Sequence, residues 1–216
     1  MLIRNWDKGT EGEWRAFLAE RDFGLLAANG SGDGGPVLVP THFVLDPDRG
    51  EILLHLAAPN PLFAAITANP RVTLAVTDDY TFVPGTWRAT QVPTSHYASV
   101  QFDCLAQAVD SAAGKAEILN RQLAHFQPQT PEARVVPGSE PFGPHLSGIR
   151  GLRLTVRQVR AKFKYDDKLP VDQQAALAER LADRAGPGDA GARAQLLRRN
   201  ARRGGAPTGT CPADHE

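Results

Sequence analysis

Short, glycine-rich turns join the β-prone runs in the first part of this chain of 216 residues. The runs Phe23–Ala28 and Pro36–Leu45 are separated only by residues 29–35, and a turn at 46–50 leads into a third run, Glu51–Leu56. Connections this short join antiparallel neighbours, because a parallel crossover needs about a dozen residues or more. The sequence therefore predicts an antiparallel sheet.

The remaining elements extend this sheet and cover it with helices. Strict alternation of apolar and polar residues over Leu152–Val159 indicates a half-buried strand. Strands are also expected at Arg71–Thr77 and Val100–Val109. Apolar spacing and capping residues predict helices over residues 11–21, 62–68, 111–126 and 172–185. We therefore expect a β-rich α+β fold, an antiparallel barrel with a few covering helices.

Charge and cysteine content argue against several classes of protein. The chain has 24 basic and 24 acidic residues, so it lacks the general positive field on which sequence-independent nucleic-acid binding relies. The charged N-terminus is unlike a signal peptide and no apolar run has membrane-spanning length, so we expect a cytoplasmic protein with no membrane segment. Cys104 and Cys211 have no His or Cys at metal-ligand spacing, and no metal site is predicted.

The C-terminal residues differ in composition from the rest of the chain. Residues 186–216 are rich in Gly, Ala, Arg and Pro and contain few large apolar side chains. Such a segment buries too little surface to offset the entropy that it loses on ordering. We therefore expect one globular domain over residues 1–185, followed by a disordered tail. The basic run Arg198–Arg203 is the segment best suited to contact DNA, although a solvated tail is the simpler explanation.

A first candidate site residue, His55, lies in an apolar run shortly before a helix start. Asn60 and Pro61 have the signature of an N-cap and of the first residue of a helix. A helix N-terminus offers unpaired backbone N–H groups, so a phosphate held near residues 58–63 would also meet donors from His55 and Asn60. On this segment alone the alternative is a satisfied core histidine and an asparagine that only caps the helix.

Two further segments place polar side chains at the edge of apolar runs. Thr41 and His42 interrupt one β-prone run, and Thr94, His96 and Tyr97 offer a hydroxyl, an imidazole and a phenol at the start of another. These groups could hydrogen-bond the edge of a planar heterocycle while an aromatic ring packs on its face. Each histidine taken alone is more often a surface or structural residue.

Lys162 and Lys164 lie two residues apart in a β-prone segment, so both side chains project from the same face of the strand. Two neighbouring ammonium groups could bind a phosphate or a partner's carboxylate, and a solvated strand end is an equally good explanation. No Gly-x-Ser-x-Gly elbow, dinucleotide fingerprint or P-loop occurs, and no side chain stands out as a general base. Catalytic residues are therefore not assigned.

Six motifs follow one another along the chain. They are Pro-Thr-His-Phe at 40–43, His-Leu-Ala-x-x-Asn-Pro at 55–61, Trp87, Val-Pro-Thr-x-x-Tyr at 92–97, Ser-Gly-Ile-x-Gly-Leu at 147–152 and Ala-Lys-Phe-Lys at 161–164. In this order they resemble the PaiB-type FMN-binding negative transcriptional regulators, within the pyridoxamine-phosphate-oxidase-like split-barrel group. The resemblance runs from about Val39 to Leu181. It implies a split β-barrel homodimer that binds FMN near the subunit interface.

The resemblance also implies which residues lie at or near the flavin. Matched to the motifs, these are Thr41, His42, His55, Asn60, Pro93, Thr94, Tyr97, Lys162 and Lys164. Around residues 85–97 the chain departs from the family pattern, because the loop is shorter, the usual lysine is missing and the family's Trp-Asn pair is Ser95-His96. Arg88 could supply the missing positive charge, and we include Arg88 and His96 among the expected cofactor-binding residues.

Three hypotheses about function remain open on the sequence. The first is a dimeric FMN-binding regulator in which flavin binding or flavin redox state alters what the dimer contacts. The second is a flavin-dependent oxidoreductase that takes electrons from a nicotinamide nucleotide. The third is a relative that has lost the cofactor and serves as a dimeric interaction module. No helix-turn-helix pattern or basic recognition helix is present in the sequence, so direct DNA contact by the globular part is poorly supported.

Overall fold

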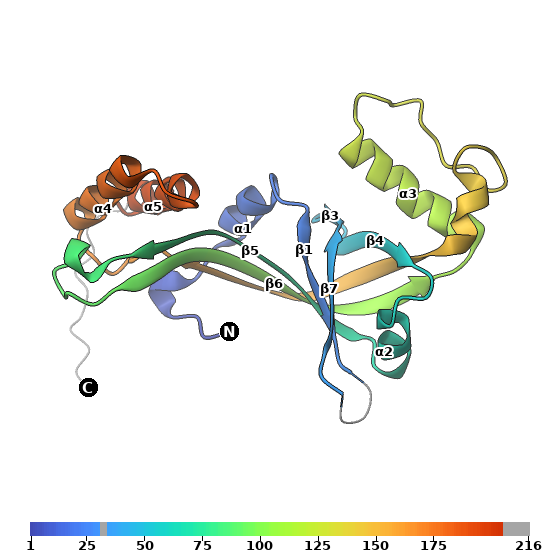
Figure 1. Ribbon diagram of the computed structural model, residues 1–216, viewed down its shortest axis with the longest axis horizontal. Coiled ribbons are helices and arrows are strands. Elements are labelled where there is room, and N and C mark those ends of the chain that lie inside the picture. The colour runs from blue at the N-terminus through green and yellow to red at the C-terminus, as the bar shows by residue number, and fades with distance from the viewer. Residues whose placement is uncertain (31–33, 205–216) are drawn as a thin grey trace. The chain divides into compact units, whose positions relative to one another are not determined.

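The computed structural model of the protein describes residues 1–30 and 34–204 (Figure 1). Within these residues, seven strands form one antiparallel sheet in the order β2-β1-β5-β6-β7-β4-β3. The strands are β1 (Phe23–Ala28), β2 (Val37–His42), β3 (Val44–Asp46), β4 (Glu51–Ala57), β5 (Arg71–Val83), β6 (Thr94–Val109) and β7 (Ile149–Lys164). Together with the covering helices, this sheet confirms the predicted β-rich α+β class.

Helices α1 and α3 begin after the capping residues that the sequence indicated. They are α1 (Glu11–Leu18), α2 (Leu62–Ala68), α3 (Ala112–Phe126), α4 (Val171–Arg184) and α5 (Asp189–Gly204), with 3-10 turns η1 (Asn5–Asp7), η2 (Gly85–Trp87) and η3 (Gly143–Gly148). At α1, Thr10 and Glu13 form the expected capping box, and at α3 the Ser111 side chain accepts a hydrogen bond from the Gly114 N–H. Helix α1 ends three residues before the predicted boundary.

One predicted strand is divided in two. The run 36–45 forms β2 and β3, which are separated at Phe43. The Phe43 N–H donates to the carbonyl oxygen of Asp22 at 2.8 Å, outside the pairing of β1 with β2, and the Phe43 side chain is buried. Beyond Phe43 the chain pairs with β4 as β3 and no longer with β1.

By contacts, the described chain divides into two compact units. Unit 1 comprises Met1–Gly9, Thr77–Ser99 and the residues from Ala161 to the end of the described part, and unit 2 comprises Thr10–Val76 and Val100–Arg160. Residues 1–185, predicted as one domain, contribute to both units. In unit 2 the core contains Leu26, Ile52, Leu54 and Leu74 from the strands, and Trp14 of α1 packs edge-on against Phe102 with ring centroids 5.8 Å apart.

The prediction of a disordered tail is wrong for residues 189–204, which form α5. Helices α4 and α5, drawn in orange and red, lie side by side in unit 1 (Figure 1). The turn between them needs Gly188, whose φ is +78° and where a Cβ atom would meet the Tyr80 carbonyl oxygen at 1.9 Å. Residues 205–216 lie outside the described residues.

Polar contacts explain why composition did not reveal α5. Few apolar side chains of this helix are buried, among them Ala192 and Leu196. The buried polar groups of the helix have partners elsewhere in unit 1. Asp189 accepts from Thr81 Oγ1 at 2.6 Å, and Gln195 Nε2 donates to Asp79 Oδ2 at 2.8 Å. The composition of a segment indicates how much apolar surface it can bury. It does not show which buried polar groups will be hydrogen-bonded, because these contacts depend on the fold.

We predict that Asp189 stabilises the folded protein in a pH-dependent way. Hydrogen bonds from Arg184 lower the pKa of this carboxyl to about 2 despite burial, with Thr81 and the Gly186 N–H as further donors. A lowered carboxyl pKa stabilises the folded state above the unfolded-state value of about 4, and this contribution is lost as the pH falls toward 2. Asp189→Asn should therefore lower the free energy of unfolding by about 2 kcal/mol at pH 7.

Denaturant titration at two pH values checks this prediction. The loss caused by Asp189→Asn should shrink to roughly half by pH 3, because protonation removes the advantage of the ionised carboxylate. Asp183→Asn, at an exposed position of α4, is the matched control and should change the stability little. An equal loss at both pH values would contradict the role of ionised Asp189.

Candidate functional site

The predicted site residues belong to two groups, one in each compact unit. The unit 1 group contains Arg88, Thr94, His96, Tyr97, Lys162 and Lys164, and the unit 2 group contains Thr41, His42, His55 and Asn60. The contacts within each group show what each can do chemically.

In unit 1, Lys162 and Lys164 lie over the ring of Tyr97. Their Nζ atoms are 5.6 and 5.9 Å from the ring centroid, and Lys164 Nζ donates to Thr94 Oγ1 at 2.9 Å. The alternate residue Phe163 is buried, as expected for the opposite face of the strand. The structure thus brings together four of the predicted residues, which we call the lysine cluster: Thr94, Tyr97, Lys162 and Lys164.

The two lysines differ in their electrostatic surroundings. Lys162 Nζ donates to the Leu2 carbonyl oxygen at 2.9 Å and lies 3.8 Å from the carboxylate of Asp7. Within the described part of the chain Lys164 has no ion pair, and burial lowers its pKa, although Asp166 acts in the opposite direction. A partly buried ammonium without a contacting carboxylate is a favourable place for an incoming anion, because the anion would supply the missing counter-charge.

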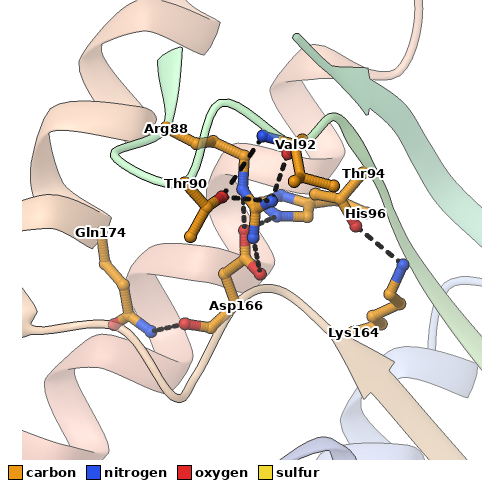
Figure 2. A network of polar contacts seen from close by, with 8 residues as sticks. All are labelled: Arg88, Thr90, Val92, Thr94, His96, Lys164, Asp166 and Gln174. Carbon is orange, nitrogen blue, oxygen red and sulfur yellow. Dashed lines mark hydrogen bonds and ion pairs between the residues drawn. The ribbon is translucent and has the colours of Figure 1, made fainter. Parts of the chain in front are cut away.

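Next to this cluster, the carboxylate of Asp166 holds Arg88 and His96 (Figure 2). Arg88 binds it through two hydrogen bonds, Nε to Oδ2 at 3.1 Å and Nη2 to Oδ1 at 2.9 Å, and His96 Nε2 lies 3.2 Å from Oδ2. Burial alone would raise the pKa of Asp166, but the hydrogen bond and charge of His96, together with Arg88, hold it below its ordinary value. Gln174 of α4 donates to the Asp166 carbonyl oxygen.

These contacts give Arg88 and His96 a structural role. Arg88 Nη1 also donates to the Val92 carbonyl oxygen, so this side chain ties the loop that precedes β6 to the chain that follows β7. His96 is fully buried, with its ring edge-on to Tyr165 at 5.5 Å between centroids. Their assignment as cofactor-binding residues stays a prediction. Sequence reasoning missed Asp166, for which the one available signal was its place directly after the strand that carries the two lysines.

We predict that Arg88→Lys loosens the loop of residues 88–93. Lysine keeps the charge but cannot form two parallel hydrogen bonds to one carboxylate. Losing a charge-assisted hydrogen bond should raise the amide hydrogen exchange rate of this loop by on the order of ten-fold. Arg180→Lys is the control, because exposed Arg180 contacts the neighbouring Thr86 carbonyl oxygen through a single long hydrogen bond of 3.4 Å. Similar exchange rates in both variants would contradict the role of the Arg88–Asp166 contact in holding this loop.

In unit 2, the side chains of His42 and His55 lie close together in apolar surroundings. Their ring centroids are 5.4 Å apart in an edge-to-face arrangement, and His42 also packs edge-on against Phe126 at 5.1 Å. Burial, with a smaller contribution from His55, lowers the pKa of His42, so its imidazole is uncharged at neutral pH. Thr41 precedes His42 in β2 and is buried, and its hydroxyl donates to the His42 carbonyl oxygen.

The Asn60 side chain binds the N-terminus of α2, but the predicted positions are shifted by one residue, with Pro61 as the N-cap. Asn60 Oδ1 accepts from the Leu62 N–H at 3.0 Å. The Asn60 side chain therefore already binds one of the N–H groups that the phosphate hypothesis for residues 58–63 relied on. Contact of Asn60 with a cofactor stays a prediction.

A residue that sequence reasoning missed, Gln122 of α3, hydrogen-bonds His55. Its Oε1 lies 2.6 Å from His55 Nδ1, and its side chain is 4% exposed. The signal was present in the helix pattern, because Gln122 lies four residues from both Ile118 and Phe126 on the apolar face of α3. A polar residue on such a face needs a partner.

Two negative findings apply to the described residues. Among them, no group of three or more His, Cys, Asp or Glu side chains is arranged to hold a metal ion. No described helix is both long enough and apolar enough to cross a membrane.

Burial raises the pKa of the Cys104 thiol to about 12, so this side chain is not a nucleophile at neutral pH.

Comparison with solved structures establishes the fold class, the split barrel that the sequence predicted. A FAD and heme binding protein from Mycobacterium smegmatis is 18% identical with a TM-score of 0.56, over 71% of each chain. A flavocytochrome from Azotobacter vinelandii is 17% identical with a TM-score of 0.55, over 74% of each chain. A conserved hypothetical protein from Mycobacterium tuberculosis is 20% identical with a TM-score of 0.55, over 79% of this chain and 94% of that one.

Comparison with protein families is more specific. The family described as "Putative FMN-binding domain" matches residues 1–158, and the chain belongs to this family of flavin-binding domains. No curated protein matches the chain.

Proposed function

We propose that this chain is an FMN-binding protein of the PaiB-like type and that the lysine cluster recognises the phosphate of the flavin nucleotide. Lys164 carries the proposal, because its partly buried ammonium lies beside a hydroxyl and has no ion pair within the described part of the chain. A phosphate supplies the counter-charge and the acceptor oxygens that this group needs. Family membership supports flavin binding, and so do the flavin proteins among the structures of similar fold.

The unit 2 group suits a different part of a flavin. Neutral His42, together with His55 and the buried Thr41, provides hydrogen-bonding groups in apolar surroundings, which fit the uncharged polar edge of a heterocycle. Contact of the unit 2 group with a flavin is a proposal separate from that for the lysine cluster, and variants in each group test the two independently. A bound flavin brings its own redox chemistry, and the protein supplies binding, orientation and electrostatics.

The proposal includes the homodimer that the family resemblance implies, with flavin-dependent regulation as its role. Direct DNA contact through the basic run is less favoured, because Arg199 is buried against Asp167. Turnover distinguishes the alternative, a flavin-dependent oxidoreductase, from the regulator. Oxidation of NADH or NADPH that depends on bound flavin would favour the oxidoreductase over the regulator.

Retention of flavin tests the proposal. Protein mixed with FMN and passed through a desalting column should retain flavin absorbance in an equimolar ratio to the subunit. Lys164→Ala should weaken FMN binding by on the order of ten-fold, the effect of losing one charge-assisted hydrogen bond. Riboflavin, which lacks the phosphate, should bind the variant as it binds the wild type, and Lys168→Ala at an exposed position is the control. Equal losses for FMN and riboflavin would contradict the phosphate assignment, and no retained flavin would favour the cofactor-free interaction module.

The pH dependence of FMN binding gives a second check. Because burial lowers the pKa of Lys164, its positive charge should be lost at a lower pH than that of an ordinary lysine. FMN affinity should therefore fall as the pH rises toward 10, while the phosphate stays fully ionised over this range. In Lys164→Arg the guanidinium stays charged, so the same titration should be flatter. An identical pH profile for wild type and variant would remove Lys164 from the site.

A further inference from the structure

The hydrogen bond between Gln122 and His55 determines which ring nitrogen of His55 carries the proton. The Oε1 atom of an amide has lone pairs and no hydrogen, so it can only accept. At 2.6 Å from this oxygen, His55 Nδ1 must therefore donate, and in the neutral ring Nε2 is left as an acceptor. The half-buried His55 thus presents a lone pair at Nε2 in place of an N–H group.

The NH2 group of the Gln122 amide indicates that the bond to His55 is the reason for a glutamine at this position. Gln122 Nε2 is buried and has no hydrogen-bond partner among the residues that the structure describes. A leucine would fill a similar volume on the apolar face of α3 without leaving a buried N–H group unpaired. Burying the amide therefore costs free energy relative to a leucine. The hydrogen bond to His55 is the interaction that offsets this cost.

We infer that Gln122 is a positioning residue that fixes the tautomer of His55, so that His55 Nε2 accepts a hydrogen bond from an N–H or O–H donor of the ligand. Under the proposed function, on which this ligand assignment rests, the donors are the imide N–H of the flavin ring and the hydroxyls of its ribityl chain. A fully ionised phosphate cannot be the partner of His55 Nε2, because its oxygens carry no hydrogen to donate. The ring of His42 lies edge-on to His55, and burial lowers the pKa of His42, so His42 adds no positive charge beside His55 at neutral pH.

The tautomer can be read directly, without flavin. Two-bond proton–nitrogen correlation spectra of nitrogen-15-labelled protein at pH 8, assigned with His55→Ala, distinguish a protonated ring nitrogen from an unprotonated one. We expect the proton on Nδ1 in the wild type, a shift of the proton toward Nε2 in Gln122→Leu, and retention on Nδ1 in Gln122→Glu, which keeps an acceptor oxygen. A wild-type proton on Nε2, or an unchanged spectrum in Gln122→Leu, would overturn the inference.

Asn120 offers a matched control on the same helix. Its amide accepts from the Val135 N–H at 2.8 Å and donates to the Val135 carbonyl oxygen at 3.1 Å, so Asn120→Leu also removes polar contacts of α3. This variant should lose stability and leave the His55 proton on Nδ1. If Asn120→Leu moved the proton as far as Gln122→Leu does, the effect would be a general loosening of α3 and the positioning role would be wrong.

A riboflavin titration tests the ligand assignment. Gln122→Leu should weaken riboflavin binding by about ten-fold, the loss of one hydrogen bond, and should add little to the loss already caused by His55→Ala. Fully additive losses would show that Gln122 does not act through His55. If the wild type binds no flavin, the proposed function fails, while the tautomer measurement still decides the role of Gln122.

Discussion

A single buried carboxylate, that of Asp166, ties together the polar side chains next to the lysine cluster. Removing a carboxylate from water is costly unless charged or hydrogen-bonding partners replace the water. Arg88 and His96 provide these partners, and the Gln174 amide holds the backbone of the same residue. The loop before β6, the start of β6, the end of β7 and helix α4 are thereby fixed to one point, and the position of Thr94 beside Lys164 depends on this arrangement.

The two groups of candidate residues differ in their electrostatic character. The lysine cluster presents positive charge that is only partly compensated, which suits an anion. In the His42–His55 group, burial lowers the pKa of His42, and the group suits hydrogen bonds to an uncharged ligand. Each group can therefore be tested by itself, the lysine cluster with an anion and the histidine group with an uncharged ligand.

The sequence was sufficient where local rules decide the structure. The glycine turns, the alternation in β7 and the capping residues of α1 and α3 predicted the sheet class and most elements, because strand pairing over short turns and helix capping involve nearby residues. It was insufficient where distant polar groups pair. Helix α5 is held through contacts of Asp189 and Gln195 with β5, and Asp166 and Gln122 entered the candidate site only through partners 78 and 67 residues away. The pairing of such groups is a property of the fold and has no local pattern.

The limits of the family match add a consequence for the lysine cluster. The match ends at residue 158, and Lys162, Lys164 and Asp166 lie just beyond it, as do α4 and α5. The matched part of this chain therefore contains strands β1 to β6, most of β7 and both His42 and His55, whereas the two lysines come from the segment that follows. Two proteins with the same family domain can differ in this segment alone, and with it in whether they prefer a phosphorylated flavin to an unphosphorylated one. Selectivity among flavins would then be set by the C-terminal extension, and the barrel would serve as a common scaffold.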